Sequence, residues 1–201
     1  MSLWWMTALA FAAPAQVVAL GDGPVMTPPG QVREAGEPVW EMVMADCLQE
    51  KAAEPWTVLD RTQPGASPEV QVGRVAEVRG LSPRAVVTLS VTGPWDEARA
   101  GEVSALLLSL SVAGGPSVFV VGPVAPAVAD QAPMDAQADR WNAGLAQLTG
   151  GMERVELVDL WADWPRSGPA RAGLTLDGGR LSDQGHARVG AALCEALLKP
   201  R

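Results

Sequence analysis

The stretch Gln16-Val17-Val18-Ala19-Leu20-Gly21-Asp22-Gly23 decides the fold of this chain. Its first five residues form a short apolar run that predicts a buried strand, and the glycines after it predict a sharp turn. Four more apolar runs follow along the chain, at 56–59, 85–91, 117–121 and 155–160. None of them alternates cleanly between apolar and polar residues, which is typical of parallel strands that are covered on both faces.

Helical patterns lie between these strands. Apolar residues recur at helical spacing in four segments, at 38–48, 96–112, 138–148 and 182–197. Strands that alternate with helices predict a parallel sheet between two helical layers. We therefore expect an α/β fold, a flavodoxin-like three-layer α/β/α sandwich with a five-stranded parallel sheet. In such sheets ligands bind beyond the carboxyl ends of the strands, so the loops after the strands are where function is expected.

Length and composition restrict the class of protein. A chain of 201 residues with 48% hydrophobic and 19% charged residues can bury a sizeable core, and we expect residues 16–201 to form one domain. The formal net charge is -8. Because affinity for nucleic acid depends on clustered Lys and Arg, and the sequence has no such cluster, a nucleic-acid partner is not expected.

The first 15 residues are apolar and carry no charge. They end in Ala13-Pro14-Ala15, a small-x-small pattern of the kind that signal peptidase cleaves, which indicates a signal peptide and a secreted or periplasmic protein. The alternative is an apolar lead-in packed on a cytoplasmic domain, because the positive charge expected at the start of a signal peptide is missing. In either case the run is too short to span a bilayer, so no transmembrane segment is expected.

Two cysteines, Cys47 and Cys194, lie in segments that are both predicted to be helical. Two thiols with no neighbouring histidine do not make an ordinary zinc site. The sequence leaves two alternatives, a pair of buried thiols or a disulfide, and an oxidising compartment favours the disulfide.

The turn after the first strand and the segment Asp177-Gly178-Gly179-Arg180 resemble the first and last sequence blocks of the SGNH (GDSL-type) hydrolases, a family of esterases. In that family the first block reads Gly-Asp-Ser, with the serine as nucleophile, and the last reads Asp-x-x-His, with the histidine as its base. Here Gly23 stands in place of the serine and Arg180 in place of the histidine, while Asp177 keeps the position of the triad acid.

The two middle blocks of the family can also be placed, so the resemblance spans about residues 16–198. The second centres on Gly65, and the third is Gly93-Pro94-Trp95-Asp96, in which Trp95 stands where the family has asparagine. The resemblance implies an oxyanion hole formed by the backbone N–H groups of Gly23 and Gly65. It also implies that the side-chain donor of that hole is lost at Trp95.

Acyl transfer needs a nucleophile, a base and donors for the developing negative charge. Gly23 has no side chain with which to attack, and Arg180 keeps its proton at ordinary pH. We expect Asp177 to pair with Arg180 instead. Loss of one catalytic member of a serine triad lowers kcat about 10⁶-fold. Ordinary ester hydrolysis is therefore expected to be nearly absent.

Other residues near these blocks have a structural and a functional interpretation. His186, the sole histidine, is the only candidate for a rebuilt base, but its place in the last helix favours a structural role. Asp22 and Asp96 flank turns, where carboxylates accept backbone N–H bonds and cap helices. Indoles can stack on a sugar ring or an apolar ligand or can pack as core, and packing is the default for any single Trp. For Trp95, which replaces a polar site residue of the family, the two interpretations have equal weight. The residues that we select as candidates for binding are Asp22, Trp95, Asp96, Trp161, Trp164, Asp177 and Arg180.

The sequence therefore predicts a protein with an SGNH frame and a degraded triad, a pseudoenzyme that binds a glycan, an acylated ligand or a protein partner. One alternative is an active esterase or acetyl hydrolase that uses relocated residues, such as His186 with a neighbouring hydroxyl. Another is a structural or assembly subunit. No metal site or cofactor is expected, because no ligand spacing typical of a metal site is present.

Overall fold

A computed structural model describes residues 13–23, 25–26, 39–89, 93–176 and 179–200 of the protein. Five parallel strands form one sheet in the order β2-β1-β3-β4-β5. Their bounds are β1 Ala15–Gly21, β2 Trp56–Thr62, β3 Ala85–Leu89, β4 Ser117–Val121 and β5 Val155–Val158. The strand order is that of the flavodoxin-like folds, so the expected architecture is confirmed.

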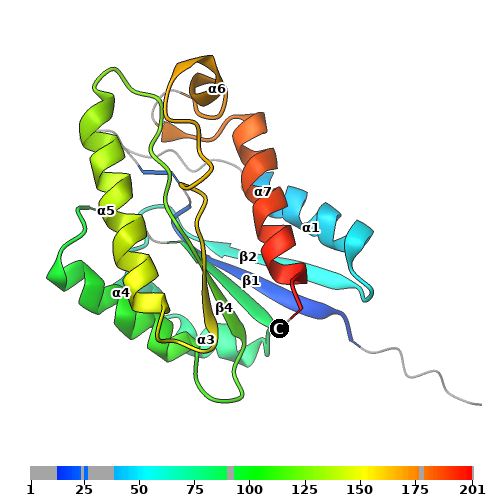
Figure 1. The fold of residues 1–201 in the computed structure, drawn as a ribbon. Helices are drawn as coiled ribbons and strands as arrows, with labels where there is room; N and C mark the ends of the chain where they lie inside the picture. The colour runs from blue at the N-terminus through cyan, green and yellow to red at the C-terminus, as the bar shows by residue number, and fades with distance from the viewer. Residues whose placement is uncertain (1–12, 24, 27–38, 90–92, 177–178, 201) are drawn as a thin grey trace, which may run out of the picture.

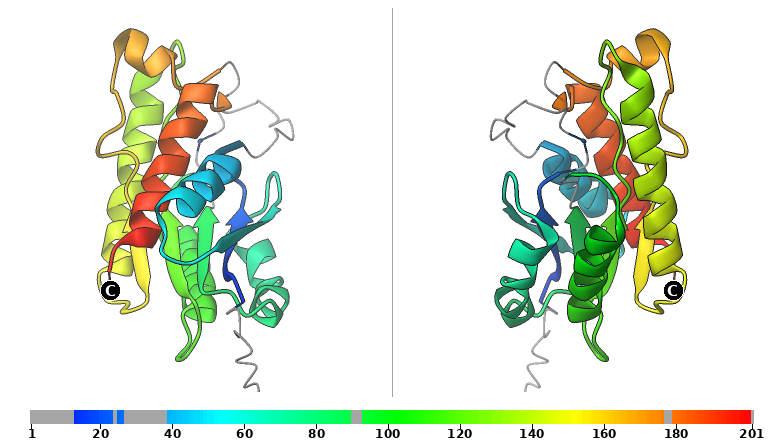
Figure 2. Two further views of the ribbon diagram at one scale, coloured as in Figure 1. Left: turned by 90° about the vertical axis from the view of Figure 1, so that its right-hand side faces the viewer. Right: turned by 90° about the vertical axis from the view of Figure 1, so that its left-hand side faces the viewer.

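Helices cover both faces of the sheet (Figures 1 and 2). One face carries the neighbouring helices α1 and α7, and the other carries α4 and α5 with the shorter α2 and α3. The bounds are α1 Val39–Lys51, α2 Pro68–Val72, α3 Val75–Gly80, α4 Glu97–Leu110, α5 Gln131–Thr149, α6 Gly168–Ala172 and α7 Asp183–Leu198. The sequence did not predict α2, α3 and α6, because helices of five or six residues contain too few turns to show an apolar period.

The core lies on both faces of the three central strands. Val17 to Leu20 of β1 are fully buried, as are Val86 and Val87 of β3. A strand that is buried on both faces cannot alternate between apolar and polar residues, which explains the continuous apolar runs in the sequence. The predicted ends of β2 and β5 differ from the structure. β2 continues to Thr62 rather than ending at residue 59, and β5 stops at Val158 rather than at residue 160. The predicted end of β3 at residue 91 lies outside the described ranges.

A disulfide joins α1 to α7 through Cys47 and Cys194, whose Cα atoms are 6.1 Å apart. Of the two alternatives that the sequence left open, the structure has the bridge and not the buried thiols. One turn earlier the helices touch closely, because a Cβ added to Gly190 would lie 2.6 Å from the Cβ of Val43. The cross-link spans 147 residues. Closing a loop of that length lowers the entropy of the unfolded chain enough to stabilise the fold by about 5 kcal/mol, as an upper value.

The register of the sheet places the ends of three strands side by side. Gly21, the last residue of β1, pairs with Thr62 of β2 on one side and with Leu89 of β3 on the other. The loops that follow these strands therefore leave the same edge of the sheet, at the point where the strand order reverses. In open α/β sheets this is where a ligand site is expected.

Candidate functional site

The turn after β1 has a backbone conformation that favours glycine. Gly21 has φ 120° and Gly23 has φ 117°, and Gly23 is buried. An L-residue with a side chain is strained at such a φ. The position at which the family carries its nucleophilic serine therefore lacks the hydroxyl and also has a backbone that disfavours a serine.

The first and second blocks meet through a hydrogen bond between Asp22 and Gly65. The N–H of Gly65 donates to Oδ1 of Asp22 over 2.6 Å, and the N–H of Gln63 donates to the carbonyl of Gly21 over 2.7 Å. Asp22 is half-buried and Gly65 is exposed, with φ 73°. The resemblance implied that the Gly65 N–H is an oxyanion donor, whereas in this structure its acceptor is a carboxylate of the chain itself.

The third block is fixed to α5. The carbonyl of Gly93 accepts hydrogen bonds from Nε2 of Gln137 at 2.9 Å and from Nε1 of Trp141 at 3.1 Å. Trp95 packs edge-on against Trp141, with ring centroids 4.9 Å apart and an interplanar angle of 64°. Its indole also covers Gly144, where an added Cβ would lie 2.0 Å from a ring atom. Trp95 is thus half-buried and packed on α5, the interpretation that the sequence weighed equally with ligand binding.

Asp96 caps α4. Its backbone is extended, and its Oδ1 accepts the N–H of Arg99 over 2.8 Å. The structural interpretation of this residue is confirmed, since a side-chain acceptor at this position satisfies an N–H that has no partner inside the helix.

The last block lies in the segment before α7. Thr175 and Leu181 form an antiparallel bridge, and the N–H of Leu176 donates to the carbonyl of Arg180 over 2.7 Å. Arg180 is exposed, and Gly179 before it has φ 79°. Asp177 lies outside the described residues, so its expected pairing with Arg180 stays a prediction.

His186 is half-buried in the first turn of α7. Ser182, the N-cap of that helix, accepts the N–H of Gly185 over 3.2 Å, and its hydroxyl donates to the carbonyl of Gly173. The nearest hydroxyl in the sequence is therefore already used in capping the helix and holding the preceding loop.

Trp161 and Trp164, which the sequence selects as candidates for binding, are almost fully buried. Each is 2% exposed. Nε1 of Trp161 donates to Oδ1 of Asp139 over 2.6 Å, and the guanidinium of Arg166 lies 3.6 Å above its ring centroid. Both indoles pack beneath the loops, where burial of their large apolar surface is favourable. One face of Trp161 is already covered by the guanidinium of Arg166.

Arg171 of α6 is a residue that the sequence analysis missed. It is 1% exposed and forms an ion pair with Asp135 of α5. A single arginine in a short helix gives no signal in the sequence, because its burial depends on loops far apart along the chain.

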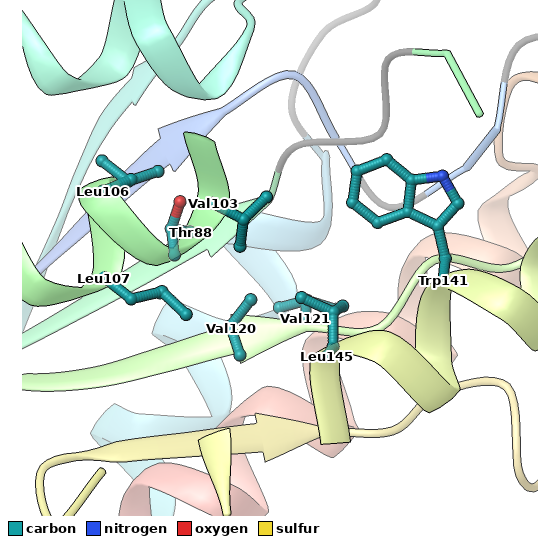
Figure 3. A pocket seen from close by; sticks show the side chains of 8 residues that line it. All are labelled: Thr88, Val103, Leu106, Leu107, Val120, Val121, Trp141 and Leu145. Atoms are coloured by element: carbon teal, nitrogen blue, oxygen red, sulfur yellow. The ribbon is translucent and has the colours of Figure 1, made fainter. Parts of the chain in front are cut away.

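The described residues line two cavities in whose walls no residue of the four blocks takes part. One, between the sheet and α4 and α5, measures about 10 Å³, space for about one water. Figure 3 shows that its wall is apolar apart from Thr88, with Trp141 over one end. The other, of about 400 Å³, lies at the amino ends of the strands, between Trp56, Arg84, Ser117 and the end of α7. It is therefore at the opposite edge from the four blocks.

Within the described ranges, no group of three or more His, Cys, Asp and Glu residues is arranged to hold a metal ion. None of the helices in those ranges combines the length and the apolar character that crossing a membrane requires.

Several solved structures with the same fold are described as hydrolases. A lipase/acylhydrolase from Enterococcus faecalis superposes with a TM-score of 0.71 at 18% identity, covering 93% of this chain and 98% of that one. A catalytic mutant of an acetylxylan esterase from Geobacillus stearothermophilus gives 0.69 at 15% identity, with coverage of 94% and 97%. An alpha/beta hydrolase enzyme from the metagenome of Lake Arreo in Spain gives 0.70 at 15% identity, with coverage of 92% and 96%.

No protein-family model matches this sequence, and no curated protein matches it either. The structural similarity confirms the SGNH-hydrolase fold that the sequence blocks predicted. At such low identity the similarity concerns the fold and not the chemistry.

Proposed function

We propose that this chain is a catalytically silent relative of the SGNH hydrolases that binds a ligand or a partner at the carboxyl edge of its sheet. The observation that carries the proposal is Gly23, buried with φ 117° at the position of the nucleophile. Arg180 supports it, because a guanidinium at the position of the base cannot accept a proton. The hydrogen bond from Gly65 to Asp22 supports it further, since one of the two backbone donors that the resemblance implies already has an acceptor.

A hydrolysis assay tests the loss of activity. Purified protein is incubated with p-nitrophenyl acetate beside a Gly65→Ala variant, which changes the second block. The added Cβ meets no atom within 4 Å, but the φ of 73° strains a side chain, so the fold of the variant is checked by circular dichroism. We expect equal, near-background rates for the two proteins. The proposal would be refuted if the natural chain hydrolysed the ester at a rate well above that of the variant, and if this activity disappeared on heating at the temperature at which the natural chain unfolds.

For the ligand we propose a glycan or an acylated surface component. Support comes from the acetylxylan esterase among the proteins of the same fold. Binding is measured by calorimetry with acetylated and deacetylated xylan oligosaccharides. Arg180→Ala is the test variant and Arg84→Ala the control, because Arg84 is an exposed arginine at the opposite edge. Loss of binding in Arg180→Ala alone is the expected result, and equal binding by both variants would place the ligand elsewhere.

A protein partner is the other form of the proposal. If no oligosaccharide binds, cross-linking from a photoreactive residue at position 176, an exposed site beside Arg180, is compared with cross-linking from position 84. A partner captured only from position 176, and no longer captured when Arg180→Ala is added to that variant, is the expected result in that case. Capture from both positions, or from neither, would remove the support for this surface.

A second candidate is an esterase or acetyl hydrolase with relocated residues, favoured by the hydrolases among the similar structures. It needs a hydroxyl within reach of His186. The test is labelling by a fluorophosphonate probe, with mass spectrometry to identify the labelled residue. Labelling of the natural chain that disappears in His186→Ala would support this candidate over the silent one.

We further propose that the protein is exported and functions in a secreted or periplasmic compartment. The disulfide between Cys47 and Cys194 supports this, because such bonds persist in oxidising compartments. So does the small-x-small pattern that ends at Ala15, although Ala15 is already the first residue of β1. N-terminal sequencing of the native protein tests the proposal, with a start at Gln16 expected and an intact Met1 as the contrary result.

A further inference from the structure

We propose that Arg171 is a positioning residue, whose buried guanidinium ties the bridge of Thr175 and Leu181 to the loop after β4. Arg180 is next to this bridge, so the position of the last block depends on a residue outside all four blocks. The inference concerns the geometry of this edge and holds whether or not a ligand binds there.

The guanidinium of Arg171 is held by a carboxylate and by backbone. Its two terminal nitrogens donate to Asp135, to Oδ1 over 2.7 Å and to Oδ2 over 3.2 Å. They also donate to the carbonyls of Ala125 at 2.9 Å, Pro126 at 3.3 Å and Arg166 at 2.9 Å. A single side chain therefore joins α6 to α5, to the loop after β4 and to the loop after β5.

The ring of Trp161 also lies close to the guanidinium of Arg171. Its ring centroid lies 5.3 Å from the Cζ atom of Arg171 and 3.6 Å from that of Arg166. Asp139 accepts from the indole at 2.6 Å and from Arg166 at 3.2 Å. Because the guanidinium is planar and presents a fork of donors, it can bind a carboxylate, carbonyls and a ring at once, which a lysine ammonium cannot do.

Short contacts connect the end of α6 to the last block. The chain leaves α6 through Gly173, whose carbonyl accepts from the hydroxyl of Ser182, and the N–H of Ser182 donates to the carbonyl of Leu174 over 3.0 Å. Thr175 accepts the N–H of Ala127 over 3.0 Å at its Oγ1, a second direct link to the loop after β4. α7 fits closely here, because a Cβ on Gly185 would lie 2.1 Å from the carbonyl oxygen of Leu174.

Hydrogen exchange of individual amides tests the proposal. The reporting amides are those of Ala127, Leu176 and Ser182, and the reference is that of Arg84, which donates to Gln16 at the far edge. In Arg171→Met, removing one partner of a buried ion pair strongly destabilises the region. We expect the three reporting amides to lose at least about tenfold more protection than the reference amide, because the opening is local.

Two more variants make the experiment decisive. Arg171→Lys keeps the positive charge but lacks the planar fork of donors. We expect it to lower the protection of the three reporting amides by a smaller factor than Arg171→Met does. If Arg171→Met does not fold, Arg171→Lys alone provides the test. Arg154→Met is the control, because Arg154 is also a partly buried arginine that donates to a backbone carbonyl, that of Gly115. Equal loss of protection at all four amides in the Arg171 variants, or a change in Arg154→Met that matches theirs, would overturn the proposal.

Discussion

The carboxylate of Asp22 and the backbone N–H of Gly65 are joined by a hydrogen bond of 2.6 Å, although the two residues are 43 positions apart. This bond connects the turn after β1 to the loop after β2. It also gives an internal acceptor to the N–H that the family resemblance assigns to the oxyanion hole. The same bond therefore stabilises the contact between the two loops and occupies this donor.

Asp22→Ala is expected to loosen the connection between the two loops. A hydrogen bond to a charged group contributes about 1.5–3 kcal/mol, and the half-buried position of Asp22 places the expected loss in the free energy of unfolding near the lower end. Urea unfolding measures the loss. Asp60→Ala is the control, because Asp60 accepts only from Thr62, two residues away. If the free energy of unfolding fell by the same amount in both variants, the hydrogen bond between the two loops would contribute no more than a local one.

The φ of Gly23 predicts opposite effects for two glycine substitutions. Gly23→Ala forces a side chain into a left-handed conformation and is expected to destabilise the protein by about 1–2 kcal/mol. Gly101→Ala lies inside α4 with no atom within 4 Å of the added Cβ, and it is expected to stabilise by up to about 1 kcal/mol. Thermal unfolding of the two variants checks the signs, and destabilisation by both would argue against the assigned conformation of Gly23.

The strained φ of position 23 also predicts that esterase activity does not return when only the catalytic side chains of the family are put back. The triple variant Gly23→Ser, Trp95→Asn, Arg180→His returns the family residues to three positions, but serine at φ 117° is strained and Asp22 still occupies the Gly65 donor. We expect p-nitrophenyl acetate hydrolysis to stay near background. A gain of about 10³-fold or more, in the range that a triad with its oxyanion hole supplies, would show that the backbone here is still competent.

Trp95 and Gly144 form a pair that a double-mutant cycle can measure. Gly144→Ala places a Cβ 2.0 Å from the indole and is expected to destabilise by about 1–3 kcal/mol, the usual effect of overpacking. In the Trp95→Ala background the clash is absent, so the same change is expected to be neutral or favourable, since Ala is a better helix former than Gly. The coupling is obtained from four unfolding experiments, and additive effects would mean that the two residues do not touch.

The disulfide is expected to contribute strongly to stability. Cys47→Ala with Cys194→Ala is expected to lower the free energy of unfolding by about 2–5 kcal/mol. The unfolding temperature is measured with and without dithiothreitol. The natural chain should lose stability in the reductant, whereas the double variant should be indifferent to it. Equal sensitivity of both proteins would contradict a bond between these cysteines.

The sequence predicted the sheet well because burial on both faces leaves a direct trace, a continuous apolar run such as Val17 to Leu20. It predicted the meeting of Asp22 and Gly65 at one edge, since parallel strands end together. It did not predict the hydrogen bond itself, because that depends on a φ of 120° at Gly21 and 117° at Gly23 that no pattern reveals.

Other features depend on contacts that the sequence does not encode locally. The indole of Trp95 packs on α5 because Gly144 leaves room for it, 49 residues further along the chain. Arg171 is buried because the loops after β4 and β5 and the helix α5 converge on it. Neither Gly144 nor Arg171 stands in a motif, so spacing along the chain carries no information about their surroundings.

The cross-link between Cys47 and Cys194 closes a covalent ring that contains four of the five strands, β2 to β5. A protease that cuts once in any loop inside this ring produces two fragments that remain attached to each other. The turn that carries Gly23 lies on the tail outside the ring, yet β1 is held in the middle of the sheet between two ringed strands. Nicked protein would therefore keep its shape and run as one band on a gel until reductant is added.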